Sequence, residues 1–265
     1  MNEPVRPAAA ADPALAPGVT PSGITEDALL GGRVRLRQPT SGYRAAIDPV
    51  FLAAAVAAGP QDSVLDMGCG AGAASLCLAA RLPGCRIAGF DLQRDLVRLA
   101  GDNIQLNGFA GRLSVMQGDL LNPPPRLAPG SFDHVMANPP FLEAGAATPP
   151  ADPRAATARL EGEADLAAWA RVALFMVRAK GSITFIHRAD RIETLLALLA
   201  GKAGDIAIFP LWPGEGKPAK RVILRARKQI ATPTRLLPGL VLHRPDGRFT
   251  PAAEAVLRGA AALEL

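Results

Sequence analysis

The sequence predicts an α/β fold with a doubly wound, mostly parallel sheet and an antiparallel last strand. From Ser63 onward, short apolar runs alternate with amphipathic stretches of helical length, an order typical of βαβ units. Between the last two runs, residues 188–218 carry a helix, a short strand candidate at 206–209 and a Pro/Gly-rich turn. Such a connection lets the chain turn back, so we expect the final strand to run antiparallel to its neighbour.

Each element follows from a local pattern. Short apolar or alternating runs bounded by turn residues predict strands at 32–37, 63–67, 86–91, 113–117, 132–137, 181–187 and 219–227. Helical spacing of apolar residues predicts helices at 71–81, 92–107, 163–178 and 189–201. A further helix is expected to begin at Asp48-Pro49, because aspartate is a good N-cap and proline suits the first helical position.

Composition divides the chain into three segments. Residues 1–24 are rich in Ala, Pro and Gly and lack apolar periodicity, which predicts a disordered leader. Residues 25–230 hold the alternating strands and helices and are expected to form one domain. Residues 231–265 are predicted to be an ordered C-terminal extension packed on that domain.

Charge and cysteine content limit the classes of function. The three cysteines are too few and too irregular for a disulfide framework or a zinc site, and the longest apolar stretch, 50–59, is too short to span a bilayer. No signal peptide is evident, so we expect a cytoplasmic protein with no metal and no membrane partner. The net charge of +5, with basic clusters at 33–44 and 217–228, fits a nucleic acid partner or two solvated basic faces.

The strongest motif spans residues 63–72, where an apolar run ends in Asp66 and passes through a Gly-x-Gly-x-Gly loop into a helix. Gly68, Cys69 and Gly70 form a sharp turn that a ligand can approach closely. The Asp66 carboxylate would repel the pyrophosphate of a dinucleotide and attract the ammonium of S-adenosylmethionine. The glycine spacing also differs from that of dinucleotide sites. The motif therefore predicts S-adenosyl-L-methionine as the cofactor.

Acidic residues also follow the next two strands. Asp91 is placed to accept hydrogen bonds from both ribose hydroxyls, and Leu92 to cover one face of the adenine. Asp119 could accept a hydrogen bond from the adenine amino group, with Leu120 beside it in the same site. One such acid alone is more typical of a helix cap or a loop. Three at successive strand ends meet at one edge of a parallel sheet, which favours a shared binding site.

The fourth strand ends in Asn138-Pro139-Pro140-Phe141. Two prolines fix an extended backbone and remove two donors, which leaves the Asn138 side-chain oxygen and the Pro139 carbonyl as rigid acceptors. Both hydrogens of an exocyclic amine could be held there, with the nitrogen lone pair directed at a sulfonium methyl. Phe141 would stack on a planar acceptor. These residues predict methyl transfer to an amino or amide nitrogen without a strong general base.

The motifs resemble the Asn-Pro-Pro-Tyr/Phe branch of the class I methyltransferases, whose fold is Rossmann-like. Within that branch the chain resembles the bacterial tRNA(Val) (adenine-N6) methyltransferases, which act next to the anticodon. The similarity covers roughly residues 25–230 and includes Gly42-Tyr43-Arg44, the run 103–108 and the run 158–161. It departs from the family at Gln93, where an acid is usual, and at Phe141, where tyrosine is common.

The resemblance implies further site residues. It places Arg44 and Asp48 near the methionine end of the cofactor. Arg154 and Arg159 follow the catalytic loop and would contact substrate phosphate, or else pair with acidic residues of the next helix. On the last strand, Arg221, Arg225 and Arg227 share one face by period-two alternation and are expected to form an outward row of phosphate-binding guanidinium groups.

The acceptor is not fixed by these motifs. RNA, and tRNA adenine N6 in particular, is favoured by the basic clusters. A release-factor glutamine offers the same two hydrogens, but such enzymes usually carry a helical N-terminal substrate domain, and few regular elements precede Ser63. DNA adenine methylation lacks an obvious target-recognition domain. A non-enzymatic binding module is disfavoured because both the cofactor and the catalytic motifs are intact.

Overall fold

The computed structural model describes residues 18–20, 23–40, 44–140, 142–143, 160–161 and 165–265. Phe141, Arg154 and Arg159 of the predicted site lie outside these residues. The strands of the main sheet are β4 (Ser63–Met67), β5 (Arg86–Asp91), β6 (Leu113–Gln117), β7 (Phe132–Ala137), β10 (Val177–Arg188), β11 (Ala203–Trp212), β12 (Arg221–Lys228), β13 (Arg235–Leu236) and β14 (Leu240–Val241). The helices are α1 (Asp48–Ala55), α2 (Ala73–Arg81), α3 (Arg94–Leu106), α5 (Leu166–Met176), α6 (Ile192–Leu199) and α7 (Pro251–Leu257).

The main sheet runs in the order β13-β11-β12-β10-β7-β4-β5-β6, with β14 paired to β11. Neighbouring strands from β10 through β7, β4 and β5 to β6 are parallel. Strand β12 lies between β10 and β11 and is antiparallel to both. The predicted α/β class with a mostly parallel sheet and an antiparallel late strand is therefore confirmed. Four predicted strands, β4 to β7, have the bounds expected from the sequence.

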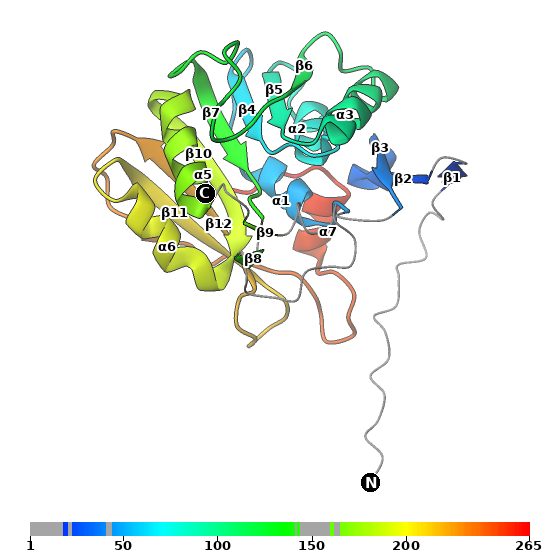
Figure 1. The fold of residues 1–265 in the computed structure, drawn as a ribbon. Coiled ribbons are helices and arrows are strands. Elements are labelled where there is room, and N and C mark those ends of the chain that lie inside the picture. The colour runs from blue at the N-terminus through cyan, green and yellow to red at the C-terminus, as the bar shows by residue number, and fades with distance from the viewer. Residues whose placement is uncertain (1–17, 21–22, 41–43, 141, 144–159, 162–164) are drawn as a thin grey trace.

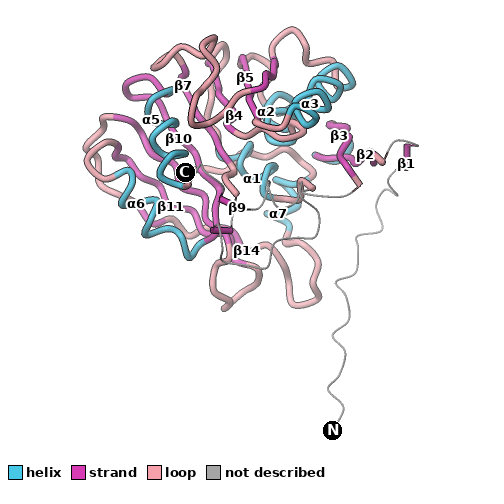
Figure 2. Tube along the Cα trace, in the orientation of Figure 1, coloured by secondary structure: helices cyan, strands magenta, loops and turns pink. Residues whose placement is uncertain are grey.

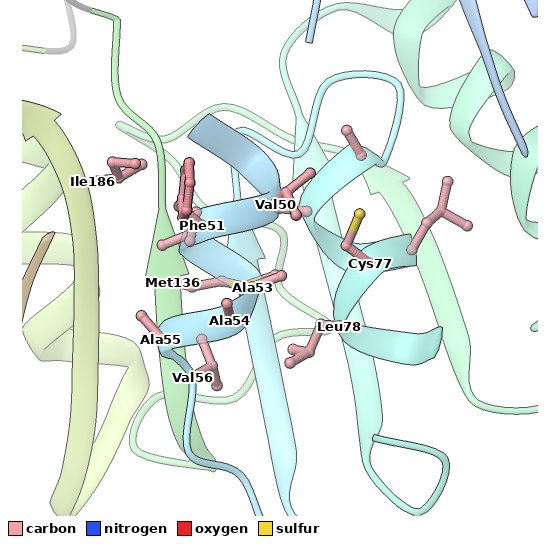
Figure 3. Packing of buried hydrophobic residues seen from close by; sticks show 14 of the residues in the cluster. Val50, Phe51, Ala53, Ala54, Ala55, Val56, Cys77, Leu78, Met136 and Ile186 are labelled. Atoms are coloured by element: carbon pink, nitrogen blue, oxygen red, sulfur yellow. The ribbon is translucent and has the colours of Figure 1, made fainter. Parts of the chain in front are cut away.

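Helices cover both faces of this sheet (Figures 1 and 2). On one face, α1 and α2 bury residues such as Val50, Phe51 and Cys77 against Met136 of β7 and Ile186 of β10 (Figure 3). On the other face, α5 and α6 pack on the intervening sheet residues, because alternate side chains of a strand point to opposite faces. The two layers hold the carboxyl ends of β4, β5 and β7 in fixed positions.

A separate antiparallel sheet precedes α1. It contains β1 (Gly18–Thr20), β2 (Ile24–Leu29) and β3 (Val34–Pro39), and the short 3-10 helix η1 (Leu30–Gly32) joins the last two. Strand β3 was expected, but β1 lies inside the segment predicted to be a disordered leader. For residues 18–20 that prediction is wrong, because these residues pair with β2.

Side-chain amides of α3 join β3 to the main domain. Asn103 accepts from Arg37 N at 2.8 Å and donates to Arg37 O at 3.0 Å, and one helical turn later Asn107 bonds Arg35 N and O in the same way, at 2.9 and 2.7 Å. Residues four apart lie on one helix face, so the two amides continue the pairing of β3 as a further strand would. Asn103 also donates to Ala71 O at 3.0 Å, within the glycine loop.

The segment after residue 230 extends the same sheet and core. Strands β13 and β14 pair with β11, and Ala253 and Val256 of α7 are buried against α1 and its neighbours. Thr250 caps α7 by accepting from Ala253 N at 3.2 Å. Among the residues that the structure describes, no helix has both the length and the apolar character needed to cross a membrane.

Candidate active site

A cavity of about 1000 Å³ opens at the carboxyl edge of the parallel strands. Its wall contains residues from the ends of four strands that are far apart in the sequence. These include Asp66 near the end of β4, Asp91 at the end of β5, Asp119 after β6 and Asn138 after β7. The three acids and the asparagine that the sequence placed at strand ends therefore lie around one space.

The glycine loop between β4 and α2 forms the floor of this cavity. Gly68, Gly70 and Gly72 have φ angles of 66°, 55° and 89°, a region that side chains with a Cβ rarely adopt. At Gly68 space excludes a side chain as well, because a Cβ would come within 2.4 Å of the Trp169 ring. Cys69 is buried and its backbone N–H donates to Phe90 O at 3.0 Å. The loop thus exposes backbone to the cavity instead of side chains.

Asp66 is almost completely buried, at 2 % exposure. Its carboxylate accepts a hydrogen bond from Ser75 Oγ at 2.6 Å. The pKa of Asp66 is raised to about 7, mainly because the carboxyl is buried. The hydrogen bond from Ser75 opposes this rise, and the negative charge of Asp91 adds to it. A cationic group bound beside Asp66 would stabilise its charged form, so the site is suited to an ammonium ligand.

Asp91 bridges the glycine loop and the start of α3. Its two oxygens accept from Gly70 N and from Gln93 N, each at 2.9 Å. Burial raises the pKa of Asp91, and these two backbone bonds lower it. A carboxylate has about four acceptor positions, so each oxygen retains one for a further donor. This arrangement fits a pair of neighbouring hydroxyls, as on a ribose.

Apolar side chains line the cavity where the chain leaves β5 and β6. Leu92 lines it and is 56 % exposed, as expected of a residue that covers a planar ligand. Leu120 and its neighbour Leu121 both line the cavity, Leu120 as a buried residue and Leu121 as an exposed one. Asp119 is exposed at the rim, where its Oδ1 accepts from Leu121 N at 2.9 Å. The sequence did not single out Leu121, because a leucine after a strand is not distinctive.

The Asn138-Pro139-Pro140 segment leaves β7 beside the glycine loop. The Asn138 Oδ1 atom is buried in the cavity wall. On the adjacent strand β10, the fully buried ring of His187 has its pKa lowered to about 4 by burial, against an opposing hydrogen bond with the Pro140 backbone. His187 is therefore neutral at physiological pH, and it contacts the segment through the backbone of Pro140. The sequence assigned no role to His187.

Trp169 of α5 is a further cavity residue that sequence reasoning missed. It is 7 % exposed and packs against Gly68. A tryptophan on an amphipathic helix is most often a core residue, so nothing in the pattern distinguished it. The geometry adds it to the wall of the site.

Arg44 and Asp48 both line the cavity, but each already has partners. The Arg44 guanidinium donates to Asp27 Oδ2 at 2.7 Å and to Pro39 O at 3.0 Å. The prediction that Asp48 caps α1 is wrong. Ile47, already in helical geometry, occupies the cap position, and Asp48 Oδ2 accepts instead from Arg221 Nε at 3.0 Å.

The expected outward row of arginines on β12 is only partly present. The guanidinium of Arg225 is half-buried and donates to the main-chain oxygen of Leu265, and burial lowers its pKa. Arg221 pairs with Asp48 at the cavity, while Arg227 lies 4.0 Å from Asp205. Arg225 does not point freely outward, because the main chain at Leu265 covers part of this face.

The first basic segment is also largely paired within the protein. Arg35 and Arg37 both bond Glu26, at 2.7 and 3.2 Å, and Arg33 donates to Gly259 O at 2.9 Å. Besides Arg44, the cavity wall contains Arg188, Lys220 and Arg221, which lie at the ends of β10 and β12. Arg188 pairs with Asp190 and Arg221 with Asp48. Within the described parts of the chain, no three His, Cys, Asp or Glu side chains converge as a metal site requires.

Known proteins resemble this chain in sequence and in fold. Residues 47–158 match the family model described as the methyltransferase small domain. A crystal structure of a predicted O-methyltransferase from Agrobacterium tumefaciens shares the fold, with a TM-score of 0.69, 24 % identity, and coverage of 82 % of this chain and 98 % of that chain. Geranyl diphosphate C-methyltransferase from Streptomyces coelicolor A3(2), solved with S-adenosyl-L-homocysteine, has a TM-score of 0.51 at 14 % identity, over 68 % of this chain and 79 % of that one.

The chain is therefore an S-adenosylmethionine-dependent methyltransferase with a Rossmann-like fold. Within this class it is similar to tRNA1(Val) (adenine(37)-N6)-methyltransferase of Vibrio campbellii, with 24 % identity over 78 % of this chain and 84 % of the relative. It is also 30 % identical to the release factor glutamine methyltransferase of Chlorobaculum tepidum, over 56 % of this chain and 52 % of that relative.

Proposed function

We propose that the protein methylates the N6 nitrogen of an adenosine in tRNA. The observation that carries the proposal is the position of Asn138, whose buried Oδ1 lies in the wall of the same cavity as Asp66 and Asp91. Bound S-adenosylmethionine supplies an electrophilic methyl group on its sulfonium. The residues of the chain then have to hold the cofactor, hold the acceptor nitrogen in line with that methyl group, and exclude competing groups.

Each strand end has a separate part in holding the cofactor. Asp66 would pair with the ammonium, and the two free acceptor positions of Asp91 would receive the ribose hydroxyls. Asp119 at the rim would accept from the adenine amino group, between the apolar side chains of Leu92 and Leu121. Gly68, Cys69 and Gly70 would let the ligand lie against backbone.

Asn138 and Pro139 act on the acceptor. Their oxygens would accept the two hydrogens of an exocyclic amine and so favour a nitrogen whose lone pair faces the methyl group. His187, neutral and buried behind Pro140, would keep this loop in place. The stacking role of Phe141 and the phosphate contacts of Arg154 and Arg159 are predictions for residues outside the described parts of the chain.

Two observations favour tRNA over a protein glutamine. The similarity to the tRNA methyltransferase extends over 84 % of that relative, whereas the match to the release factor enzyme covers 52 % of it. In addition, Arg188, Lys220 and Arg221 line the same cavity as Asn138. Arg188 and Arg221 pair with Asp190 and Asp48, so the exposed Lys220 would be the main contact for phosphates flanking an unstacked adenosine.

Methyl transfer to defined substrates tests the proposal. Purified protein would be given radiolabelled cofactor with unmodified tRNA transcripts, and in parallel with a release-factor peptide that contains a glutamine. We expect label in one tRNA species and N6-methyladenosine in its nucleoside digest. Label in the peptide and none in any tRNA would instead assign the glutamine reaction.

A further inference from the structure

Trp169 lines the cavity and carries a buried hydrogen-bond donor. Its Nε1 atom is shielded from solvent and has no acceptor among the residues that the structure describes. The ring as a whole is 7 % exposed, and the residue lines the cavity. Buried donors in folded proteins nearly always have a partner, so an unpaired one beside a ligand cavity points to an acceptor on the ligand.

The second tryptophan of the chain provides an internal comparison. Trp212 Nε1 donates to Pro238 O at 3.0 Å, as expected of an indole packed against backbone. Of the two indole N–H groups, only that of Trp212 has a hydrogen-bond acceptor within the described chain. The difference is specific to the tryptophan at the cavity.

The position of Trp169 indicates which ligand would supply the acceptor. The ring lies directly on Gly68, the first glycine of the loop, where a Cβ would be 2.4 Å from Cη2. The charged groups near that loop, Asp66 and Asp91, are acceptors and match the ammonium and hydroxyls of the cofactor. The cofactor also carries acceptors, above all its carboxylate. Gly70 N, a nearby donor of the loop, is already used by Asp91.

We infer that the indole N–H of Trp169 donates a hydrogen bond to the bound S-adenosyl cofactor and is a cofactor-binding residue. The inference depends only on the cofactor that donates the methyl group and not on the molecule that is methylated. It can therefore hold or fail independently of the tRNA proposal. It adds a neutral donor to the carboxylates of Asp66, Asp91 and Asp119 among the polar side chains proposed to hold the cofactor.

Nuclear magnetic resonance of the wild-type protein tests this directly. Two tryptophans give two indole ¹⁵N–¹H signals, assigned by replacing either residue with phenylalanine. On titration with S-adenosyl-L-homocysteine, the Trp169 signal should move downfield and exchange more slowly with water, while that of Trp212 stays in place. A Trp169 signal that moves no more than the Trp212 signal would overturn the inference.

Phenylalanine variants give an independent measurement. Trp169→Phe should raise the calorimetric Kd for S-adenosyl-L-homocysteine by roughly 5- to 30-fold, since it removes one buried hydrogen bond to the ligand. Trp212→Phe, the matched control, should leave that Kd unchanged. Without ligand the order should reverse: Trp212→Phe lowers the melting temperature more, because only it breaks a bond present in the free protein. Equal Kd values for wild type and a folded Trp169→Phe protein would contradict the inference.

Discussion

The side chain of Asn103 pairs with the backbone of Arg37 on both sides, accepting from its N–H at 2.8 Å and donating to its carbonyl at 3.0 Å. The same amide donates to Ala71 O at 3.0 Å. One fully buried side chain thus connects the N-terminal sheet, helix α3 and the glycine loop.

We expect Asn103→Ala to lower the free energy of unfolding by about 2–4 kcal/mol, because it removes a fully buried side chain and leaves three partly buried backbone groups without partners. Asn107→Ala is the matched control. Asn107 also makes three hydrogen bonds, to Arg35 N, Arg35 O and Asn103 O, but at more exposed positions, so its loss should cost only about 1 kcal/mol. Urea unfolding measures both values. Equal losses would show that burial of Asn103 does not determine its effect.

Replacement of Asp91 should weaken cofactor binding. Asp91→Ala removes a carboxylate with two unused acceptor positions, and the Kd should rise by about 10- to 150-fold, equivalent to roughly 1.5–3 kcal/mol. Asp119→Ala should have a smaller effect, because Asp119 is exposed and its interactions compete with water. Calorimetry with S-adenosyl-L-homocysteine compares the two. The ribose assignment fails if Asp91→Ala binds as tightly as wild type.

Cofactor affinity should rise with pH through neutrality. Burial raises the pKa of Asp66 to about 7, so at pH 6 the free protein must lose a proton before an ammonium can pair with the carboxylate. The Kd should therefore fall several-fold, up to roughly tenfold, between about pH 6 and 7.5. In the ligand-free protein a raised carboxyl pKa favours the folded state at acid pH, and this stabilisation is lost as pH rises from about 4 to 7.

Asp66→Asn supplies the control for this pH dependence. It keeps the size of the side chain and cannot ionise. Its Kd should be higher than that of wild type near pH 7.5 and should vary little between about pH 6 and 7.5. A wild-type Kd that is equally flat would separate Asp66 from the ammonium.

Asn138→Ala should abolish methyl transfer while cofactor affinity stays within about twofold of wild type. The amide oxygen is proposed to orient the acceptor nitrogen, so its loss should appear in the chemical step. Single-turnover rates with tRNA, together with calorimetry, separate these effects. Activity within a few-fold of wild type would exclude the proposed orientation.

Binding of tRNA should depend steeply on salt through the exposed cations near the start of β12. Lys217→Gln with Lys220→Gln should weaken binding and reduce the log–log salt slope by about 0.7–0.9 for each phosphate that the variant no longer neutralises. The pair Arg86→Gln and Lys202→Gln, also exposed but outside the cavity wall, should leave the slope unchanged. Arg225 is less suitable for this test because its substitution breaks the hydrogen bond to Leu265. Equal slopes for both double variants would locate RNA binding elsewhere.

The parts of the fold predicted from sequence are those fixed by local patterns. Strands β4 to β7 are largely apolar runs that meet a Gly, an Asp or an Asn-Pro pair at their carboxyl ends, and their bounds needed no tertiary information. Strand β2 was missed because its sequence is polar, and it is held by pairing with β3 and by the bond from Arg44 to Asp27. The ion pair of Asp48 and the cavity position of Trp169 could not be predicted either. Arg221, which pairs with Asp48, lies 173 positions away in the sequence, and Trp169 reaches the cavity through its packing on Gly68.

The strand at one edge of the main sheet has a consequence for self-association. Strand β13 is only two residues long. One residue further on come Pro238, which has no N–H, and Gly239, where an added Cβ would lie 2.2 Å from Pro210 O. An open row of backbone donors and acceptors would be a template for a strand of another molecule. Here the row of backbone donors and acceptors is interrupted beside the end of β11. Edge-to-edge pairing of sheets and strand exchange between copies are therefore disfavoured along this side of the protein.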